Sequence, residues 1–243
     1  VELLNRGWNV DLAAVKARLG VDRLVAVNDF IAMARSAPEL TGSELRSISK
    51  GEADPRGSCA IGGPGTGFGV GLLRRIAAGW VVIGGEGGHQ AFTPETDIEW
   101  KLAERLRRKL GYVSNEVVTA GMGFEDTRDA LFEVMGVKPR PLTQAEVIDA
   151  ASAGDAAALE FCRLRARAVM TSIGNMALVA NATGGVFIAG GVSQRLEPWL
   201  KERSALDRFY KRGAREDLMK PIPINLIASE AAPLIGSAHL WRD

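Results

Sequence analysis

The chain has 243 residues, of which 47% are hydrophobic and 24% are charged, a balance typical of a globular protein with one large domain or two small ones. Thirty basic and 29 acidic residues give a net charge of +1, which indicates no nucleic-acid partner and no membrane-surface patch. The longest apolar runs are too short to span a bilayer, and no secretory signal is visible at the start.

The two cysteines, Cys59 and Cys162, lie far apart and form no Cys-x-x-Cys pair. A structural zinc site is therefore not expected, and the reducing cytoplasm is the default location. The chain begins with valine rather than methionine, and its first residues read like the middle of a longer segment. We therefore expect the chain to be a fragment of a longer one.

A first helix is predicted at about 12–19, ended by Gly20, and the stretch Leu24–Phe30 follows it. Four apolar residues in a row predict a buried parallel strand that runs into Asn28 and Asp29. Ligands of open α/β sheets bind beyond the carboxyl ends of strands, where a carboxylate beside an amide can accept a hydroxyl proton. The alternative is that Asn28 or Asp29 only caps the next helix, which Pro38 ends.

A glycine-rich turn over residues 62–69 is expected after a polar connection, residues 41–57, which is the predicted domain boundary. The turn joins two predicted strands, Ser58–Ile61 and Val70–Ile76, so it is neither a dinucleotide fingerprint nor a P-loop. Its successive N–H groups can form an anion-binding nest, and Thr66 adds a hydroxyl. The alternative is a flexible hairpin tip.

A third strand, Trp80–Ile83, is predicted to lie antiparallel to its neighbour and to end in Gly-Gly-Glu-Gly-Gly-His. The glycines leave room for a ligand to approach while Glu86 and His89 point at it, and the chain has only two histidines. The alternative is a loop whose histidine caps a nearby helix. A metal site is not indicated, because no second His or Cys stands at ligand spacing.

The rest of the chain alternates helices with two further strands. Glu116, in Ser114-Asn115-Glu116, is either the N3 carboxylate of a local cap or a ligand-binding group. A strand followed by Gly190-Gly191 and a helix start predicts a nucleotide or phosphate site. The other predicted elements are helices at Asp97–Leu110, up to Val134, from Thr143, from Asp155 to about Ala180, at Leu196–Glu202, within 203–220 and at Pro233–Trp241, and a strand at Ile222–Ile227.

Four polar or glycine-rich clusters thus follow four strands: Asn28-Asp29, the 62–69 turn, Glu86-Gly-Gly-His89 and Gly190-Gly191. Their order and their residues resemble the bacterial glucokinase family of the sugar kinase/actin-like ATPase fold. The resemblance extends over the whole chain, and it includes Gly-Pro-Gly-Thr-Gly-Phe-Gly, Gly-Gly-Val-Phe-Ile-Ala-Gly-Gly-Val and Pro-Leu-Ile-Gly-Ser-Ala-His-Leu.

The resemblance implies a role for each matching residue. Asp29 would be the general base for the sugar 6-hydroxyl, while Asn28, Glu86, His89 and Glu116 would bind the other hydroxyls together with it. The turn with Gly65, Thr66 and Gly67 would lie by the ATP phosphates, and Gly190 and Gly191 would border the adenosine. Mg²⁺ would bridge the β- and γ-phosphates. Glucose and ATP are then the partners of an expected homodimer.

The implied fold is α/β, with two domains of the sugar kinase/actin-like (ribonuclease H-like) type, mixed sheets flanked by helices, and a truncated small domain. Residues 1–40 with 233–243 would be the remnant of the small domain, and 41–232 the large domain. The sequence contains no Asp-x-Gly-Gly-Thr phosphate turn of the family. The alternative to a working glucokinase is therefore a catalytically impaired sugar-binding or regulatory fragment. A nicotinamide oxidoreductase is disfavoured, because no dinucleotide fingerprint is present.

Overall fold

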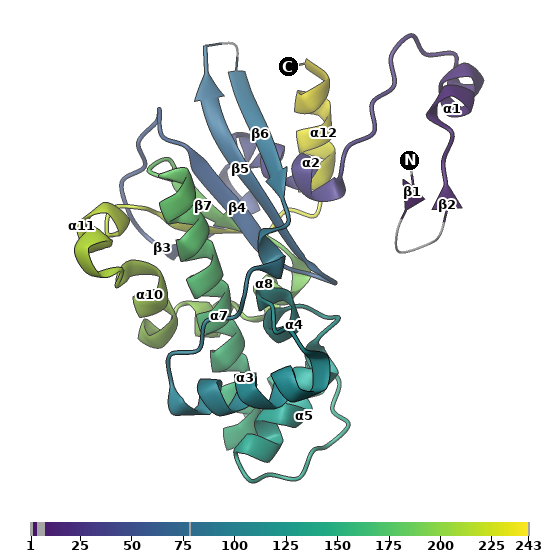
Figure 1. Ribbon diagram of the computed structural model, residues 1–243. Helices are drawn as coiled ribbons and strands as arrows, with labels where there is room; N and C mark the ends of the chain where they lie inside the picture. Colours follow the sequence, from purple (N-terminus) through teal and green to yellow (C-terminus); the bar gives the residue numbers. More distant parts are fainter. Residues whose placement is uncertain (1, 4–7, 78, 243) are drawn as a thin grey trace.

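A six-stranded mixed sheet with helices on both faces forms the centre of the computed structural model, which describes residues 2–3, 8–77 and 79–242 (Figure 1). The strand order is β3-β8-β7-β4-β5-β6. The strands are β3 (Leu45–Ser49), β4 (Cys59–Pro64), β5 (Phe68–Ile76), β6 (Gly79–Gly85), β7 (Gly185–Ile188) and β8 (Ile224–Ile227). The arrangement confirms the predicted α/β class.

The middle of the sheet is parallel and its two edges are antiparallel. Strands β4, β7 and β8 run parallel to one another. On one side, β5 and β6 continue antiparallel from β4 as a meander. On the other side, β3 pairs antiparallel with β8. Every residue of β4 and β7 is buried, as expected for strands covered on both faces. Alternate β4 residues enter separate cores. Ala60 packs in the core on the side of α7 (Ala156–Ala180), and Ile61 packs with α2 (Asp29–Ser36) and α12 (Ala232–Arg242).

The larger helical layer is built on α7 (Ala156–Ala180), which is largely buried. Asp155 caps its first turn, and Asn181 ends it in the left-handed conformation. The other helices of this layer and its edges are α3 (Asp97–Leu110), α4 (Asn115–Thr119), α5 (Phe124–Val134), α6 (Gln144–Ser152), α8 (Gly191–Arg195), α9 (Glu197–Leu200), α10 (Arg203–Tyr210) and α11 (Glu216–Met219).

Two helices from opposite ends of the chain lie side by side on the other face: α2 (Asp29–Ser36) and α12 (Ala232–Arg242) (Figure 1). They approach closely at Gly236, where a Cβ would lie 1.7 Å from the Ala32 carbonyl oxygen. Helix α2 also packs on β5, where a Cβ on Gly69 would lie 2.0 Å from the Phe30 ring. The start of α2 is therefore fixed over the start of β5.

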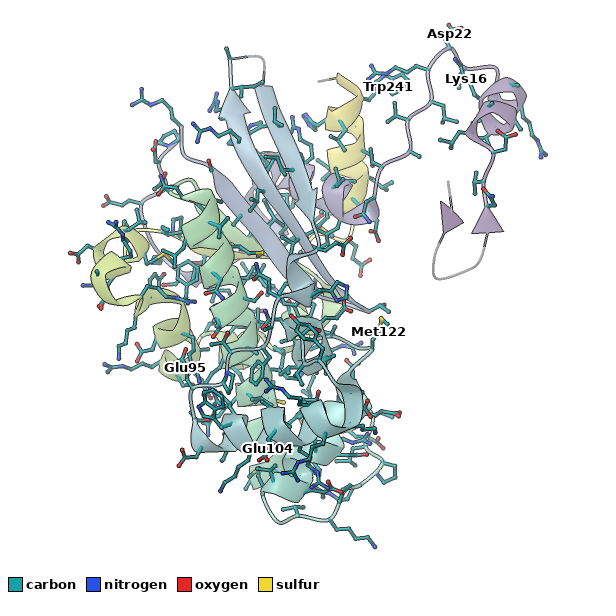
Figure 2. All side chains as sticks on the ribbon, viewed as in Figure 1. Lys16, Asp22, Glu95, Glu104, Met122 and Trp241 are labelled. Carbon is teal, nitrogen blue, oxygen red and sulfur yellow. The ribbon has the colours of Figure 1, made fainter. Side chains whose placement is uncertain are left out.

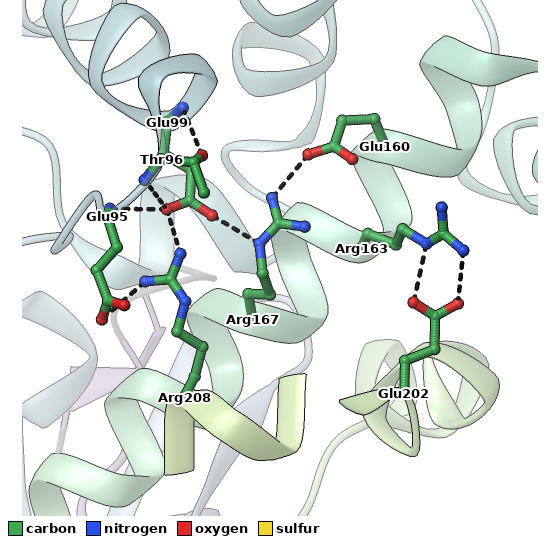
Figure 3. A network of polar contacts seen from close by, with 8 residues as sticks. All are labelled: Glu95, Thr96, Glu99, Glu160, Arg163, Arg167, Glu202 and Arg208. Atoms are coloured by element: carbon green, nitrogen blue, oxygen red, sulfur yellow. Dashed lines mark hydrogen bonds and ion pairs between the residues drawn. The ribbon is translucent and has the colours of Figure 1, made fainter. Parts of the chain in front are cut away.

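Buried charges join three helices of the larger layer (Figure 3). Glu99, near the start of α3, is 1% exposed and pairs with Arg167 of α7 and Arg208 of α10 at 2.7 and 2.6 Å. Arg167 also reaches Glu160, and Arg208 also reaches Glu95. The carboxylate and both guanidinium groups are thus compensated inside the protein.

Local signals correctly predicted most helix ends. Helix α1 (Leu12–Leu19) begins at the Asp11 cap and ends at Gly20, whose φ is +62°. Helices α3 and α6 each begin with a capping box, in which Thr96 and Thr143 are the first members. The predicted α7 agrees with the structure within a residue or two at each end.

The predicted strand at Leu24–Val27 is wrong. Residues 23–28 form no strand, and Val25 and Val27 are 54% and 42% exposed. A strand needs a neighbour for its N–H and C=O groups, and no strand pairs with this run in the part of the chain that the structure describes. Figure 1 shows it as an extended link from α1 to α2.

The residues before this link form a small unit of their own. Strands β1 (Glu2–Leu3) and β2 (Trp8–Asn9) pair with each other, and α1 has no buried residue. Arg23, at the start of the link, contacts α12: its guanidinium lies 4.8 Å from the ring of Trp241, which Figure 2 labels.

The prediction that residues 41–57 are only a connection is also wrong, because the segment contains the edge strand β3. The reason is a weak pattern: β3 has five residues, only Ile48 is buried, and its register shifts between Ser47 and Ser49. The long-range pairing with β8 forms this strand, and local sequence carries little sign of it.

Candidate active site

Asn28 and Asp29 lie at the start of α2. The Asn28 side chain caps the helix, since its Oδ1 accepts a hydrogen bond of 2.8 Å from the Phe30 N–H. Asn28 therefore caps the helix, and its role in ligand binding stays a prediction. Asp29 is the first helical residue, and it is exposed. Because Phe30 packs on Gly69, both residues stand near the start of β5.

The structure brings Glu86, His89 and Glu116 together. His89 Nε2 lies 4.0 Å from Glu86 Oε2 and 3.9 Å from Glu116 Oε1. Glu86 and His89 are largely exposed, whereas Glu116 is 17% exposed. Two carboxylates and an imidazole thus face one another at the surface, where they can accept and donate hydrogen bonds to a polar ligand.

A short antiparallel pairing between two loops creates this cluster. Ala91 and Ser114 form a β-bridge, and the Asn115 N–H donates to the Gln90 carbonyl at 2.9 Å. The Tyr112 hydroxyl adds a hydrogen bond of 2.8 Å to the His89 carbonyl. The two loops therefore bring His89, the last residue of a 3-10 turn, close to Glu116 in the first turn of α4.

Glu116 is not the N3 member of a local cap, so that alternative is wrong. Ser114 caps α4, which makes Glu116 the second helical residue. Its Oε2 instead accepts the Phe68 N–H at 2.7 Å, 48 residues away in sequence. The other oxygen, Oε1, faces His89. Glu116 therefore connects the cluster to the beginning of β5.

The glycine turn between β4 and β5 lies next to Glu116. A Cβ on Gly67 would lie 2.7 Å from Glu116 Oε2, so only glycine fits there without displacing the carboxylate. The turn is closed by a Gly65 N–H bond of 2.7 Å to the Gly67 carbonyl, and Gly121 and Met122 bond to its Gly65 and Thr66 carbonyls. These tertiary bonds argue against a floppy hairpin tip. Met122 itself is 71% exposed and lies at the surface (Figure 2).

Gly190 and Gly191 lie against the same turn. Gly190 has φ +93°, and a Cβ there would lie 2.2 Å from the Pro64 carbonyl oxygen. By contrast, a Cβ on Gly65 or on Gly191 would meet nothing within 4 Å. The predicted phosphate turn and the predicted adenosine glycines are therefore adjacent, with open space beside both.

Other types of site find little support in the described residues. Within these ranges, no three His, Cys, Asp or Glu side chains are grouped so that they could hold a metal ion. Burial raises the pKa of the Cys59 and Cys162 thiols to about 12, so neither is a thiolate near neutral pH. No helix described here is long and apolar enough to cross a membrane.

Comparison with known proteins identifies the family. The Glucokinase family profile matches residues 1–243. The glucokinase of Nitrobacter hamburgensis is 36% identical over 241 residues, covering 99% of this chain and 75% of that protein. The glucokinase of Saccharophagus degradans is 34% identical, with the same coverage of both chains. The chain belongs to the glucokinase family.

Solved glucokinases share the fold. The crystal structure of glucokinase from an Antarctic psychrotroph superposes with a TM-score of 0.90 at 32% identity, covering all of this chain and 76% of that one. A ROK family glucokinase from Streptomyces griseus, solved in complex with glucose and AMPPNP, superposes at 0.56 with 18% identity, over 94% of this chain and 70% of that one. The predicted sugar kinase/actin-like fold is confirmed.

Sequence reasoning missed the residues that hold this glucokinase-family site in place. The Phe68 N–H, which lies inside the glycine-rich motif, and the Tyr112 hydroxyl, which lies outside every motif, contact Glu116 and His89. Arg165 could have been noticed in the sequence, because it is a charged residue in a helix whose buried residues are mostly apolar or small. This pattern indicates that Arg165 is unusual, but it does not predict which group Arg165 contacts.

Proposed function

We propose that this protein transfers the γ-phosphate of ATP to the 6-hydroxyl of glucose. The proposal is carried by the position of two neighbouring groups. The first is the cluster of Glu86, His89 and Glu116. The second is the glycine turn, next to which Glu116 accepts a hydrogen bond from the Phe68 N–H. The first group has the chemistry to bind sugar hydroxyls, and the second the backbone to bind phosphates.

Sugar recognition is assigned to Asn28, Asp29, Glu86, His89 and Glu116. A hexose presents several hydroxyls that both donate and accept, and carboxylates with an imidazole meet them in defined directions. A sugar that lacks or misplaces one hydroxyl leaves a site group unpaired, which gives strong discrimination. Membership of the glucokinase family supports glucose as the substrate.

The nucleotide is assigned to the space beside Gly65, Thr66, Gly67, Gly190 and Gly191. Mg²⁺ fits here through the nucleotide, because it usually keeps several waters and is held by substrate phosphates rather than by a protein cage. The glycine turn would hold the phosphates that carry the ion. When bound, Mg²⁺ would neutralise charge on the β- and γ-phosphate oxygens.

Asp29 is proposed as the general base that accepts the proton of the 6-hydroxyl. Phosphoryl transfer is carried largely by positioning and electrostatics, and a general base typically contributes about 10²–10⁴-fold.

Residues 1–40 with 233–243 are proposed to close on 41–232 over the sugar, which would exclude water. We also propose a cytoplasmic homodimer.

The test is the Asp29→Ala variant. We expect turnover with glucose and Mg-ATP to fall by about 10²–10⁴-fold, while calorimetry still detects glucose binding. Near-normal turnover in this variant would show that another group is the base.

A second candidate function is sugar binding without catalysis. It is favoured by the exposed run at 24–27, which pairs with no strand in the part of the chain that the structure describes. Calorimetry with glucose, followed by an assay for glucose 6-phosphate with Mg-ATP, separates the two. Binding without any phosphorylated product would favour this second function.

A further inference from the structure

Helix α4 is bonded at both ends to the same glycine turn. In its first turn, Glu116 accepts the Phe68 N–H at 2.7 Å. Just beyond its last residue, the Gly121 and Met122 N–H groups donate to the Gly65 and Thr66 carbonyls at 2.9 and 3.0 Å. The position of this short helix therefore sets both the Glu116 carboxylate and the shape of the turn.

Arg165 holds this helix from the core side. It extends from α7, and its Nε donates to the carbonyl of Thr119, the last residue of α4, at 3.1 Å, while its Nη2 donates to the same oxygen. Its guanidinium lies 5.7 and 5.3 Å from the ring centroids of Phe124 and Phe161. A cation is well matched to the C-terminal carbonyls of a helix, which carry negative partial charge.

The surroundings of Arg165 are unusual for a cation. Arg165 is 3% exposed, and no carboxylate in the described part of the chain forms an ion pair with its guanidinium. Burial lowers its pKa to about 10, so it still carries its charge at neutral pH at a cost in desolvation. Packing alone would be served as well by an apolar side chain of similar length, such as methionine.

We propose that Arg165 is a positioning residue for both substrates: it fixes α4, so that Glu116 faces the sugar and the Gly65–Gly67 turn, held through its Gly65 and Thr66 carbonyls, keeps its shape beside the phosphates. The inference rests on the proposed function. Because one helix serves both halves of the site, losing its anchor affects glucose and ATP together. A residue that touched only one substrate would affect that substrate alone.

The experiment compares Arg165→Met, Arg165→Lys and a matched control, Arg212→Met. Arg212 also bonds to α7, at Thr171 and Asn175, and to Phe209 of α10. None of these hydrogen bonds, among the described residues, reaches the site. Two readouts are used: hydrogen exchange of the Phe68, Gly121 and Met122 amides, and the KM values for glucose and ATP with kcat.

We expect Arg165→Met to speed exchange at these three amides and to raise both KM values by about tenfold or more, since small misplacements in a site are costly. Arg165→Lys, which keeps a charge and a donor, should recover part of both effects. Arg212→Met should lose thermal stability and leave the three amides and both KM values as in the wild type.

The proposal is overturned if the Arg165 variants lower only the melting temperature, or if Arg212→Met changes both KM values as much as they do. If Arg165→Met does not fold, Arg165→Lys decides by the same criteria. If the wild type does not phosphorylate glucose, the proposed function fails by itself. The amide exchange then still tests whether Arg165 holds α4 against the turn.

Discussion

At the scale of single residues, Glu99 has the greatest effect on stability that we predict. Its carboxylate is buried with Arg167 and Arg208, and it also accepts the Glu95 and Thr96 N–H groups (Figure 3). Glu99→Gln would remove the buried anion that the two cations share and leave them only their more exposed partners, Glu160 and Glu95. We therefore expect the free energy of unfolding to fall by about 3–5 kcal/mol. Urea denaturation measures it. The matched control is Glu202→Gln, which removes the more exposed Arg163–Glu202 pair and should cost only about 0–1 kcal/mol.

The same residue predicts how stability depends on pH. Burial by itself would raise the pKa of Glu99, but the Glu95 N–H bond and the bonds and charges of Arg167 and Arg208 outweigh burial and lower it. In the unfolded chain the pKa is about 4.3, so the stabilisation is complete above that pH and is lost as pH falls through the lower, folded-state value. The urea midpoint of the wild type should therefore fall over this acid range by more than that of Glu99→Gln. Equal acid dependence in the two proteins would contradict the argument.

At the scale of elements, the contact between α2 and α12 depends on a missing side chain. A glycine-to-alanine change inside a helix usually stabilises it by about 0.5–1 kcal/mol, but at Gly236 the new Cβ would clash with the Ala32 carbonyl. We expect Gly236→Ala to destabilise by about 1–3 kcal/mol, as overpacking does. The melting temperature should then fall by several degrees, since about 1 kcal/mol corresponds to about 2–4 °C for a chain of this size.

The control for this contact is Ser237→Ala in the same helix, at an exposed position whose hydroxyl bonds only the Pro233 carbonyl. It should leave the melting temperature within about a degree or two of the wild type. A Gly236→Ala variant that melts as high as Ser237→Ala would show that α12 moves aside at no cost.

At the scale of the whole molecule, stability is unevenly distributed. Residues 11–29 are mostly exposed, and the link at 20–28 has little regular structure, whereas residues from 30 onward build both cores. Proteases cut exposed backbone that opens easily, so we expect trypsin to cleave first after Lys16, Arg18 or Arg23. Arg74 and Arg75 are also exposed, but β5 pairs with β6 at both residues and should resist cleavage there. Mass spectrometry of timed digests identifies the first cuts, and early cleavage after Arg74 or Arg75 would contradict this distribution.

The amino-acid sequence by itself determined the features whose causes are local. Gly20 predicted the end of its helix, Thr143 and Asp155 predicted the starts of theirs, and the glycine pairs around Glu86 and His89 predicted a site where one is now proposed. These features rest on backbone conformations and hydrogen bonds within a few residues, which a short window of sequence contains.

Only the tertiary structure decided the rest, because strands and sites depend on partners far away in the chain. The run at Leu24–Val27 has a good strand composition but pairs with no strand among the residues that the structure describes, whereas the weak β3 segment becomes a strand because β8 lies beside it. In the same way, Glu116 is linked to His89 and Phe68 by loop pairing, and Arg165 reaches α4 from 46 residues away. The residue types alone could mark these side chains as candidates, but long-range packing determined which of them contact one another.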